Sequence, residues 1–254
     1  MLPYLRLGPF LLQTSGLALL LGVWVGLTLS EKEARRQKLQ PDLVYNLVFY
    51  GLIAGLIGAR LAYAARYLNA YLQNPLSLLA LNPNTLSAID GVLIGILAAF
   101  IYGHRKRLAL RPALDALAPG LAVFMIFLGT SHLLNGDAYG APSTLPWSIF
   151  LWGEYRHPTQ IYEIVAALVV LWVVLRRPFG ASGSGLNFLF VIALSAGARL
   201  FLEAFRGDSL IWPAGLRAAQ VISLIVIILS LWLMRVWAQM QAKSHAQTLV
   251  EAPS

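Results

Sequence analysis

The chain has 254 residues, of which 58% are hydrophobic and only 12% are charged, a composition typical of a polytopic membrane protein. The net charge of +8 comes from short basic clusters between apolar segments, a distribution that indicates membrane topology and argues against nucleic-acid binding. The sequence contains no cysteine, which excludes disulfides, a cysteine nucleophile and thiolate metal sites. Any thiol in the chemistry must therefore come from a partner.

Apolar segments of membrane length recur along the chain, and each approaches the roughly 20 residues that a spanning helix needs. The seven segments cover about residues 8–30, 42–67, 88–102, 113–134, 158–175, 185–205 and 218–237. The first segment lacks a basic n-region and has its positive cluster on the following flank, so it is interpreted as a retained helix and not as a cleaved signal peptide. The sequence predicts an all-α polytopic membrane protein with about seven transmembrane helices.

The predicted organisation is one seven-helix transmembrane domain over residues 1–238, with an outer loop at 135–157, and a polar cytoplasmic tail over 239–254. Basic residues follow the first, third, fifth and seventh segments. They are Lys32, Arg35, Arg36, Lys38, Arg105, Lys106, Arg107, Arg111, Arg176, Arg177, Arg235 and Lys243. By the positive-inside rule, the N-terminus is expected outside and the C-terminus in the cytoplasm.

Glycines in the second and third segments are spaced by three or four residues. They are Gly51, Gly55, Gly58, Gly91 and Gly95. Such small residues allow two helices in a membrane to approach closely. This pattern predicts helix packing and no chemistry.

The sixth segment carries charges near its far end, at Arg199, Glu203 and Arg206. Steps of four and three place the three side chains on one helical face, where Glu203 can pair with either arginine. Because an ionisable group at mid-span costs about 2.5 to 3.5 kcal/mol, that face is expected to look into protein and away from lipid. Two interpretations stay open, a salt-bridge staple between helices and an outward-facing pocket for an anion such as phosphate.

Polar residues are concentrated between the fourth and fifth segments. The letters NGDAYG, residues 135–140, form a compact turn, and RHPTQIYE, residues 156–163, opens the fifth helix with Pro158 in its first turn. Gln160 and Glu163 carry polar groups into that span, one helical turn apart.

These motifs, with GARLFLEAFR downstream, resemble the prolipoprotein diacylglyceryl transferases of the bacterial inner membrane. The resemblance extends to LIGARLAY, SAIDGVLIG and AAQVISL, in the expected order over most of the chain. The seven-helix arrangement of that family, with its N-terminus outside, agrees with the topology inferred from charge. The resemblance therefore implies a multi-pass protein of the bacterial plasma membrane.

The resemblance also implies an activity, the transfer of a diacylglyceryl group from phosphatidylglycerol to the lipobox cysteine thiol of a preprolipoprotein, with release of glycerol phosphate. Phosphatidylglycerol, the lipobox segment and membrane lipid are the implied partners, and no metal or soluble cofactor is required. Arg199 and Arg206, oriented by Glu203, would hold the phosphate. The other residues expected to bind substrate are Asn135, Asp137, Gly140, Arg60, His157 and Gln160.

The chain is a diverged member by this resemblance. The signature GRxGNFxNGE has Gly129 here in place of its arginine and His132 in place of an asparagine, and Asp90 stands where HGGLIG has its histidine. In one explanation a rewired transferase uses His132 or Asp90 as the base beside Arg199, with Arg60 supplying the missing positive charge. In the other, a paralogue retains phospholipid binding without this chemistry.

Each candidate base also has a non-catalytic interpretation. A histidine at a helix end, such as His132, is more often a hydrogen-bonded interfacial residue than a base, and Asp90 is equally expected as a helix cap or a partner for Arg60. A transporter of a small anion is a third class, but no inverted repeat or pair of broken helices supports it. The oligomeric state stays open.

Overall fold

The computed structural model describes residues 4–8, 10–79, 85–176 and 178–250. The chain forms two compact units, one made of Met1–Gln37 and Arg111–Ser254 and the other of Lys38–Leu110, and each is described by itself. Among the described residues, seven helices are long and apolar enough to cross a membrane, which confirms the predicted fold class. The single domain over 1–238 and the orientation in the membrane remain predictions.

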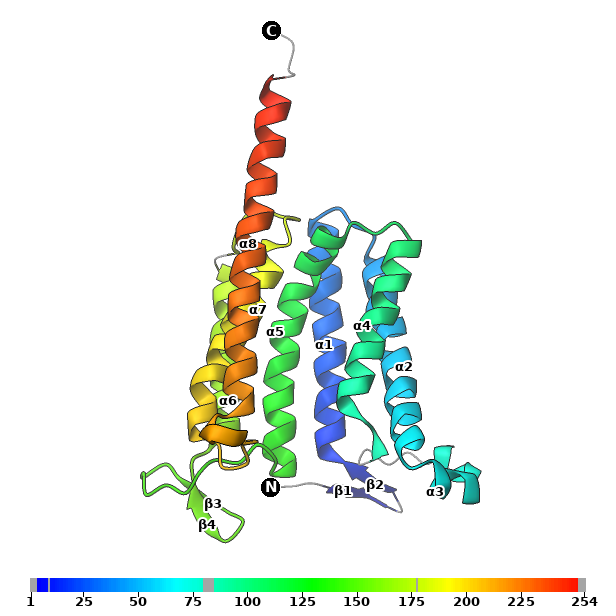
Figure 1. Ribbon diagram of the computed structural model, residues 1–254, viewed down its shortest axis with the longest axis vertical. Coiled ribbons are helices and arrows are strands. Elements are labelled where there is room, and N and C mark those ends of the chain that lie inside the picture. The colour runs from blue at the N-terminus through cyan, green and yellow to red at the C-terminus, as the bar shows by residue number, and fades with distance from the viewer. Residues whose placement is uncertain (1–3, 9, 80–84, 177, 251–254) are drawn as a thin grey trace. The chain divides into compact units, whose positions relative to one another are not determined.

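The first unit is built from helices and two short antiparallel hairpins (Figure 1). Its helices are α1 (Thr14–Arg36), α5 (Leu110–Asn135), α6 (Thr159–Arg176), α7 (Leu186–Leu202), η3 (Glu203–Phe205), η4 (Pro213–Gly215) and α8 (Ala218–Val250). The hairpins pair β1 (Tyr4–Leu7) with β2 (Phe10–Gln13) and β3 (Ile149–Leu151) with β4 (Glu154–Arg156).

Helix boundaries differ from the sequence prediction at both ends of the chain. The first span was predicted to begin at residue 8, but Gly8 has a φ of +61° in the turn region and α1 begins only at Thr14. The apolar residues before Thr14 form β1 and β2 instead, because a left-handed turn residue breaks a helix and suits a hairpin. At the other end, α8 continues to Val250 and includes part of the predicted polar tail.

The core of the first unit lies between α5, α6 and α7. Ala118 and Ala122 of α5 contact Val170 and Val174 of α6 and Val191 of α7, and all five are buried. The outward faces of the helices remain apolar. Exposed examples are Leu20, Trp24, Leu168, Trp172, Phe201 and Trp232. Small buried residues inside and large exposed apolar residues outside are what a bilayer solvent favours.

Helix α7 is capped at its start by a buried carboxylate from α5. Asp115 Oδ2 accepts a hydrogen bond of 2.8 Å from the Gly185 N–H, and Oδ1 accepts one of 3.1 Å from the Phe188 N–H. Only 2% of Asp115 is exposed. The first amides of a helix have no partner within it, so this carboxylate satisfies them and complements the helix dipole.

Replacing Asp115 with alanine should therefore lower the free energy of unfolding by about 2 kcal/mol, since buried amide donors lose a charged acceptor. Thermal unfolding of the detergent-solubilised protein measures this. Asp42→Ala, at an exposed position in the first turn of α2 (Pro41–Arg66), is the control and should change the midpoint much less. Equal midpoints for the two variants would contradict the capping role.

The second unit contains α2 (Pro41–Arg66), α3 (Leu68–Gln73), η1 (Pro75–Leu79) and α4 (Ala88–Arg105). The predicted glycine contact between its two long helices is confirmed. A Cβ atom built on Gly91 would lie 2.9 Å from the Gly55 carbonyl oxygen and 2.7 Å from the Ala59 Cβ, and Gly51 and Gly95 face each other in the same way. The two backbones therefore approach as closely as glycine alone permits.

Gly91→Ala should lower the free energy of unfolding by about 1–3 kcal/mol, because the added methyl group meets backbone on the facing helix. Gly197→Ala is the matched control in α7, where a Cβ would have no atom within 4 Å. Thermal unfolding measures both. Equal stability of the Gly91 and Gly197 variants would contradict a close contact between the two helices at Gly91.

Candidate functional site

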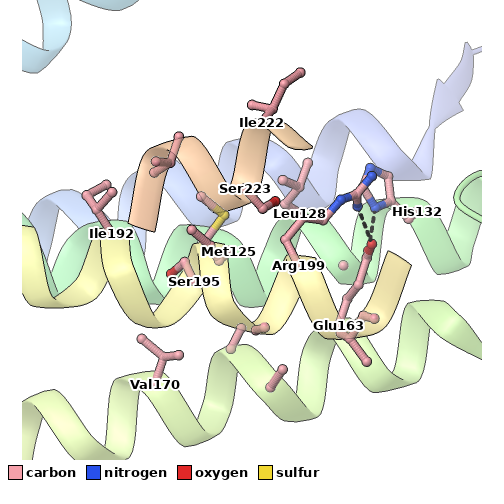
Figure 2. Close-up of a pocket in the computed structure, with 17 residues that line it drawn as sticks. Met125, Leu128, His132, Glu163, Val170, Ile192, Ser195, Arg199, Ile222 and Ser223 are labelled. Carbon is pink, nitrogen blue, oxygen red and sulfur yellow. Dashed lines mark hydrogen bonds and ion pairs between the residues drawn. The ribbon is translucent and has the colours of Figure 1, made fainter. Parts of the chain in front are cut away.

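A cavity of about 330 Å³ lies among α5, α6, α7 and α8, within the first unit (Figure 2). Its walls are mostly aliphatic or small. They comprise Met125, Leu128, Gly129, Ala166, Ala167, Val170, Ile192, Ser195, Ala196, Ala198, Leu202, Ile222, Ser223 and Val226. The remaining lining residues, His132, Glu163 and Arg199, add polar and charged groups. The cavity thus joins an apolar interior to a charged cluster.

Glu163 of α6 is the centre of that cluster. Its Oε1 accepts hydrogen bonds of 2.9 Å from Arg199 Nη1 and of 2.9 Å from Arg206 Nη1. Its Oε2 lies 2.8 Å from Nδ1 of His132. In Figure 2 the side chains of Arg199 and His132 both point toward this carboxylate. Three helix ends that are distant in sequence are therefore joined through one side chain.

Two more carboxylates surround the arginines. Glu203, predicted to pair with either arginine, has its Oε2 3.1 Å from Arg199 Nη2 and 3.7 Å from Arg206 Nε, so that prediction is confirmed. Asp208 binds Arg206 with both oxygens, at 2.9 Å to Nε and 2.7 Å to Nη2. Three carboxylates therefore face two guanidinium groups, and the cluster carries no excess of positive charge from these five side chains.

Arg199 and Arg206 differ in how exposed their guanidinium groups are. The Arg206 side chain is 10% exposed and contacts Glu163, Glu203 and Asp208. The Arg199 side chain is 37% exposed and lines the cavity. Both interpretations of this face thus find support, since Arg206 is placed as a staple between helices and Arg199 is placed where an anion can reach it.

Arg217, which precedes α8, holds the chain behind this cluster. Its Nη1 donates to the backbone oxygens of Glu203 and Arg206, and to the Ser209 hydroxyl at 2.8 Å. The Arg217 side chain thus satisfies carbonyl groups where η3 ends. This fixes the backbone that carries Glu203 and Arg206.

The polar turn at the end of α5 is held by its own side chains and by α6. The Asn135 side-chain amide donates to the Asp137 carboxylate, and Gln160 Nε2 donates to the Asp137 backbone oxygen at 2.8 Å. Gln160 is fully buried. Asn135, Asp137 and Gln160 therefore lie together, but they do not line the cavity. Their contact with substrate remains a prediction.

Gly140 and His157 belong to the same framework. A Cβ on Gly140 would collide with the His157 backbone, so this close crossing requires glycine. The His157 ring packs edge-on against Phe205, 5.3 Å between centroids, and Ala141 N–H donates to the Phe205 oxygen at 2.8 Å. The outer loop is thereby tied to the segment that carries Glu203 and Arg206. Substrate contacts by Gly140 and His157 remain predictions.

The remaining predicted site residues, Asp90 and Arg60, lie in the second unit. Asp90 binds Arg66 Nη2 at 2.6 Å and also the Ser87 hydroxyl, so the expected pairing of Asp90 with Arg60 is wrong. Arg60 donates instead to backbone oxygens, including that of Leu78 at 3.1 Å. Carbonyl groups at the end of η1 need donors, and Arg60 is the side chain that reaches them. A catalytic role for either residue remains a prediction.

Two functional candidates were absent from the predicted site, Glu163 and Asp208. The sequence could have pointed to Glu163, because it is the only charged residue between Arg156 and Arg176, in an apolar span. Its pairing with His132, 31 positions away, has no signature in a single sequence. Among the described residues, no group of three or more His, Asp or Glu side chains is arranged to hold a metal ion.

The fold and this site define a polytopic membrane protein with an amphipathic cavity, apolar along its length and ionic where Arg199 and Glu163 lie. The sequence model of the family described as prolipoprotein diacylglyceryl transferase matches residues 3–236, and the chain belongs to that family.

Individual relatives agree with this membership. The chain is 31% identical to the phosphatidylglycerol–prolipoprotein diacylglyceryl transferase of Halalkalibacterium halodurans, over 96% of this chain and 87% of that protein. The enzyme of the same name from Clostridioides difficile is 31% identical over 84% of this chain and 86% of that protein. The enzyme of the same name from Thermosynechococcus vestitus is 30% identical over 90% of this chain and 89% of that protein.

If Arg206 links the helices through its salt bridges, Arg206→Lys should lower the free energy of unfolding by about 2 kcal/mol. Lysine cannot make a bidentate contact with Asp208 and also reach Glu163. Thermal unfolding in detergent measures the change. Arg66→Lys, at a side chain that is 62% exposed and pairs with Asp90, is the control with a much smaller expected shift. An unchanged midpoint of thermal unfolding for the Arg206 variant would contradict a structural role of its salt bridges.

Proposed function

We propose that this protein transfers the diacylglyceryl group of phosphatidylglycerol to the lipobox cysteine thiol of preprolipoproteins, in the plasma membrane of a bacterium. The observation that carries this proposal is the family match over residues 3–236, combined with a cavity that is apolar inside and carries Arg199 among its lining residues. Phosphatidylglycerol has the same two-part character, with acyl chains on one side and a phosphate on the other.

Arg199 is the residue suited to the lipid phosphate. Its guanidinium lies at the cavity and keeps N–H groups beyond those that contact Glu163 and Glu203. The leaving group of the reaction is a phosphate, so a guanidinium at this place stabilises the negative charge that develops on it. The aliphatic wall formed by α5, α6, α7 and α8 accommodates acyl chain.

The peptide side of the reaction is expected at the loop that joins α5 and α6. Asn135, Asp137 and Gly140 form a fixed polar turn at the end of α5, where His132 also lies. With the N-terminus outside, this end of α5 faces the outer leaflet, where a secreted preprolipoprotein presents its cysteine. The chain itself has no cysteine, so the nucleophilic thiol comes from the substrate.

A phospholipid-binding paralogue without transferase chemistry is the alternative, motivated by Asp90 and Gly129 at places where the family signature has histidine and arginine. The relatives do not favour it, because the proteins of 30–31% identity named above are all described as transferases. The two functions differ in product formation and not in lipid binding.

The protein reconstituted with phosphatidylglycerol should convert a lipobox peptide into a thioether carrying diacylglycerol, which mass spectrometry detects. Arg199→Gln should lower kcat/KM about 10²-fold or more, since it removes a charged donor to the leaving phosphate. Arg176→Gln is the control, at the opposite end of α6 from Glu163 and about 20 Å away along the helix.

A peptide with serine in place of the lipobox cysteine should give no product. Binding of phosphatidylglycerol without any product, in a preparation with intact thermal unfolding, would support the non-catalytic alternative and exclude the transferase.

A further inference from the structure

We propose that His132 Nε2 takes the proton from the substrate thiol and that Glu163 is the positioning residue that makes this possible. This inference rests on the proposed transferase function and goes beyond it by assigning the base. His132 stands where the family signature has an asparagine, so the assignment concerns a residue particular to this chain.

The hydrogen-bond pattern of Glu163 determines which nitrogen of His132 carries the hydrogen. Oε1 accepts from two guanidinium groups, so the carboxylate is ionised and can only accept. The contact of 2.8 Å between Oε2 and His132 Nδ1 therefore requires hydrogen on Nδ1. A neutral imidazole in this tautomer keeps its lone pair on Nε2.

The position of His132 suits a base. Its side chain is 26% exposed and lines the cavity next to Arg199, where the lipid phosphate is expected. Within the described part of the chain, no group hydrogen-bonds to Nε2. The charged groups that face His132 are Glu163 from α6 and Arg199 from α7, while α8 lines the cavity only with Ile222, Ser223 and Val226.

Other candidates for the base are already engaged. The Glu163 carboxylate is bound by two arginines, and protonating it would break both ion pairs. Asp90 is bound to Arg66 and Ser87. His132 thus combines a free lone pair with a place at the cavity.

The S–H bond of the lipobox cysteine breaks and its proton moves to His132 Nε2, while sulfur attacks the glycerol methylene carbon that carries the phosphate. The new C–S bond forms as the C–O bond breaks, and the electron pair of that bond stays on the phosphate oxygen. The imidazolium then returns its proton to the released glycerol phosphate, which restores neutral His132.

A selenocysteine lipobox peptide separates proton removal from every other role of His132, because a selenol is ionised at neutral pH and needs no base. His132→Asn installs the residue usual in the family signature. It should lower kcat/KM for the cysteine peptide about 10²- to 10⁴-fold. For the selenocysteine peptide, the kcat/KM of the variant should stay within about threefold of the wild-type value.

Glu163→Gln tests the positioning role. The two arginines keep the amide oxygen on their side, so the amide NH₂ group faces His132 Nδ1 and forces the hydrogen onto Nε2. This tautomer cannot accept the thiol proton. The kcat/KM of this variant should be about 10²-fold below that of the wild type with the cysteine peptide, and close to that of the wild type with the selenocysteine peptide.

The controls are His104→Asn, at an exposed histidine of α4, and Glu154→Gln, at a carboxylate that is 55% exposed on β4. Both substitutions should leave kcat/KM unchanged for the cysteine peptide and for the selenocysteine peptide. Thermal unfolding of each variant shows that it is folded.

The outcomes are distinct. Equal losses on both peptides for either variant would overturn the inference, since the residue would then act in binding or folding. Full activity of His132→Asn or Glu163→Gln on the cysteine peptide would overturn it as well. A folded wild-type protein that modifies neither peptide would instead refute the proposed function.

Discussion

The structure of the candidate site depends on one interaction, the sharing of the Glu163 carboxylate by Arg199, Arg206 and His132. A carboxylate that is 14% exposed within a membrane-length helix is tolerable only because two guanidinium groups and an imidazole contact it. The same contacts fix where α5, α6 and the end of α7 lie relative to one another. Stability and chemistry are therefore coupled here, because removing the carboxylate leaves two cations without their main partner.

The loop between α5 and α6 supports this arrangement from behind. Ala141 N–H donates to the Phe205 oxygen, and Gly207 N–H donates to the Tyr139 oxygen at 2.9 Å. These backbone bonds join the outer loop to the segment that follows α7. Thr159, fully buried, adds a hydrogen bond from its hydroxyl to the Ala138 oxygen. The polar residues that looked like a binding loop in the sequence thus also build the support for Glu203 and Arg206.

The sequence predicted the seven spans and the pairing of Glu203 with its arginines because both follow from local periodicity. Hydropathy identifies membrane-length helices, and steps of three and four place side chains on one face. It did not predict the contact between Glu163 and His132, which depends on how two helices are rotated against each other. It also offered Arg60 as a partner for Asp90, whereas the structure pairs Asp90 with Arg66, six residues further along α2, and Arg60 donates to backbone oxygens. The hairpin before Thr14 was missed because its apolar residues continue the hydropathy of α1.

Helix α7 is anchored to protein at both ends, by the Asp115 cap at its start and by the ionic cluster around Arg199 at its finish. Its 17 residues span about 25 Å, somewhat less than the roughly 30 Å of a hydrocarbon core. A helix without such anchors adapts to a thicker or thinner bilayer by tilting or shifting. With both ends bound to neighbouring segments, α7 cannot tilt or shift without α5 and α6. The spacing of the charged groups is thereby insulated from the composition of the surrounding membrane.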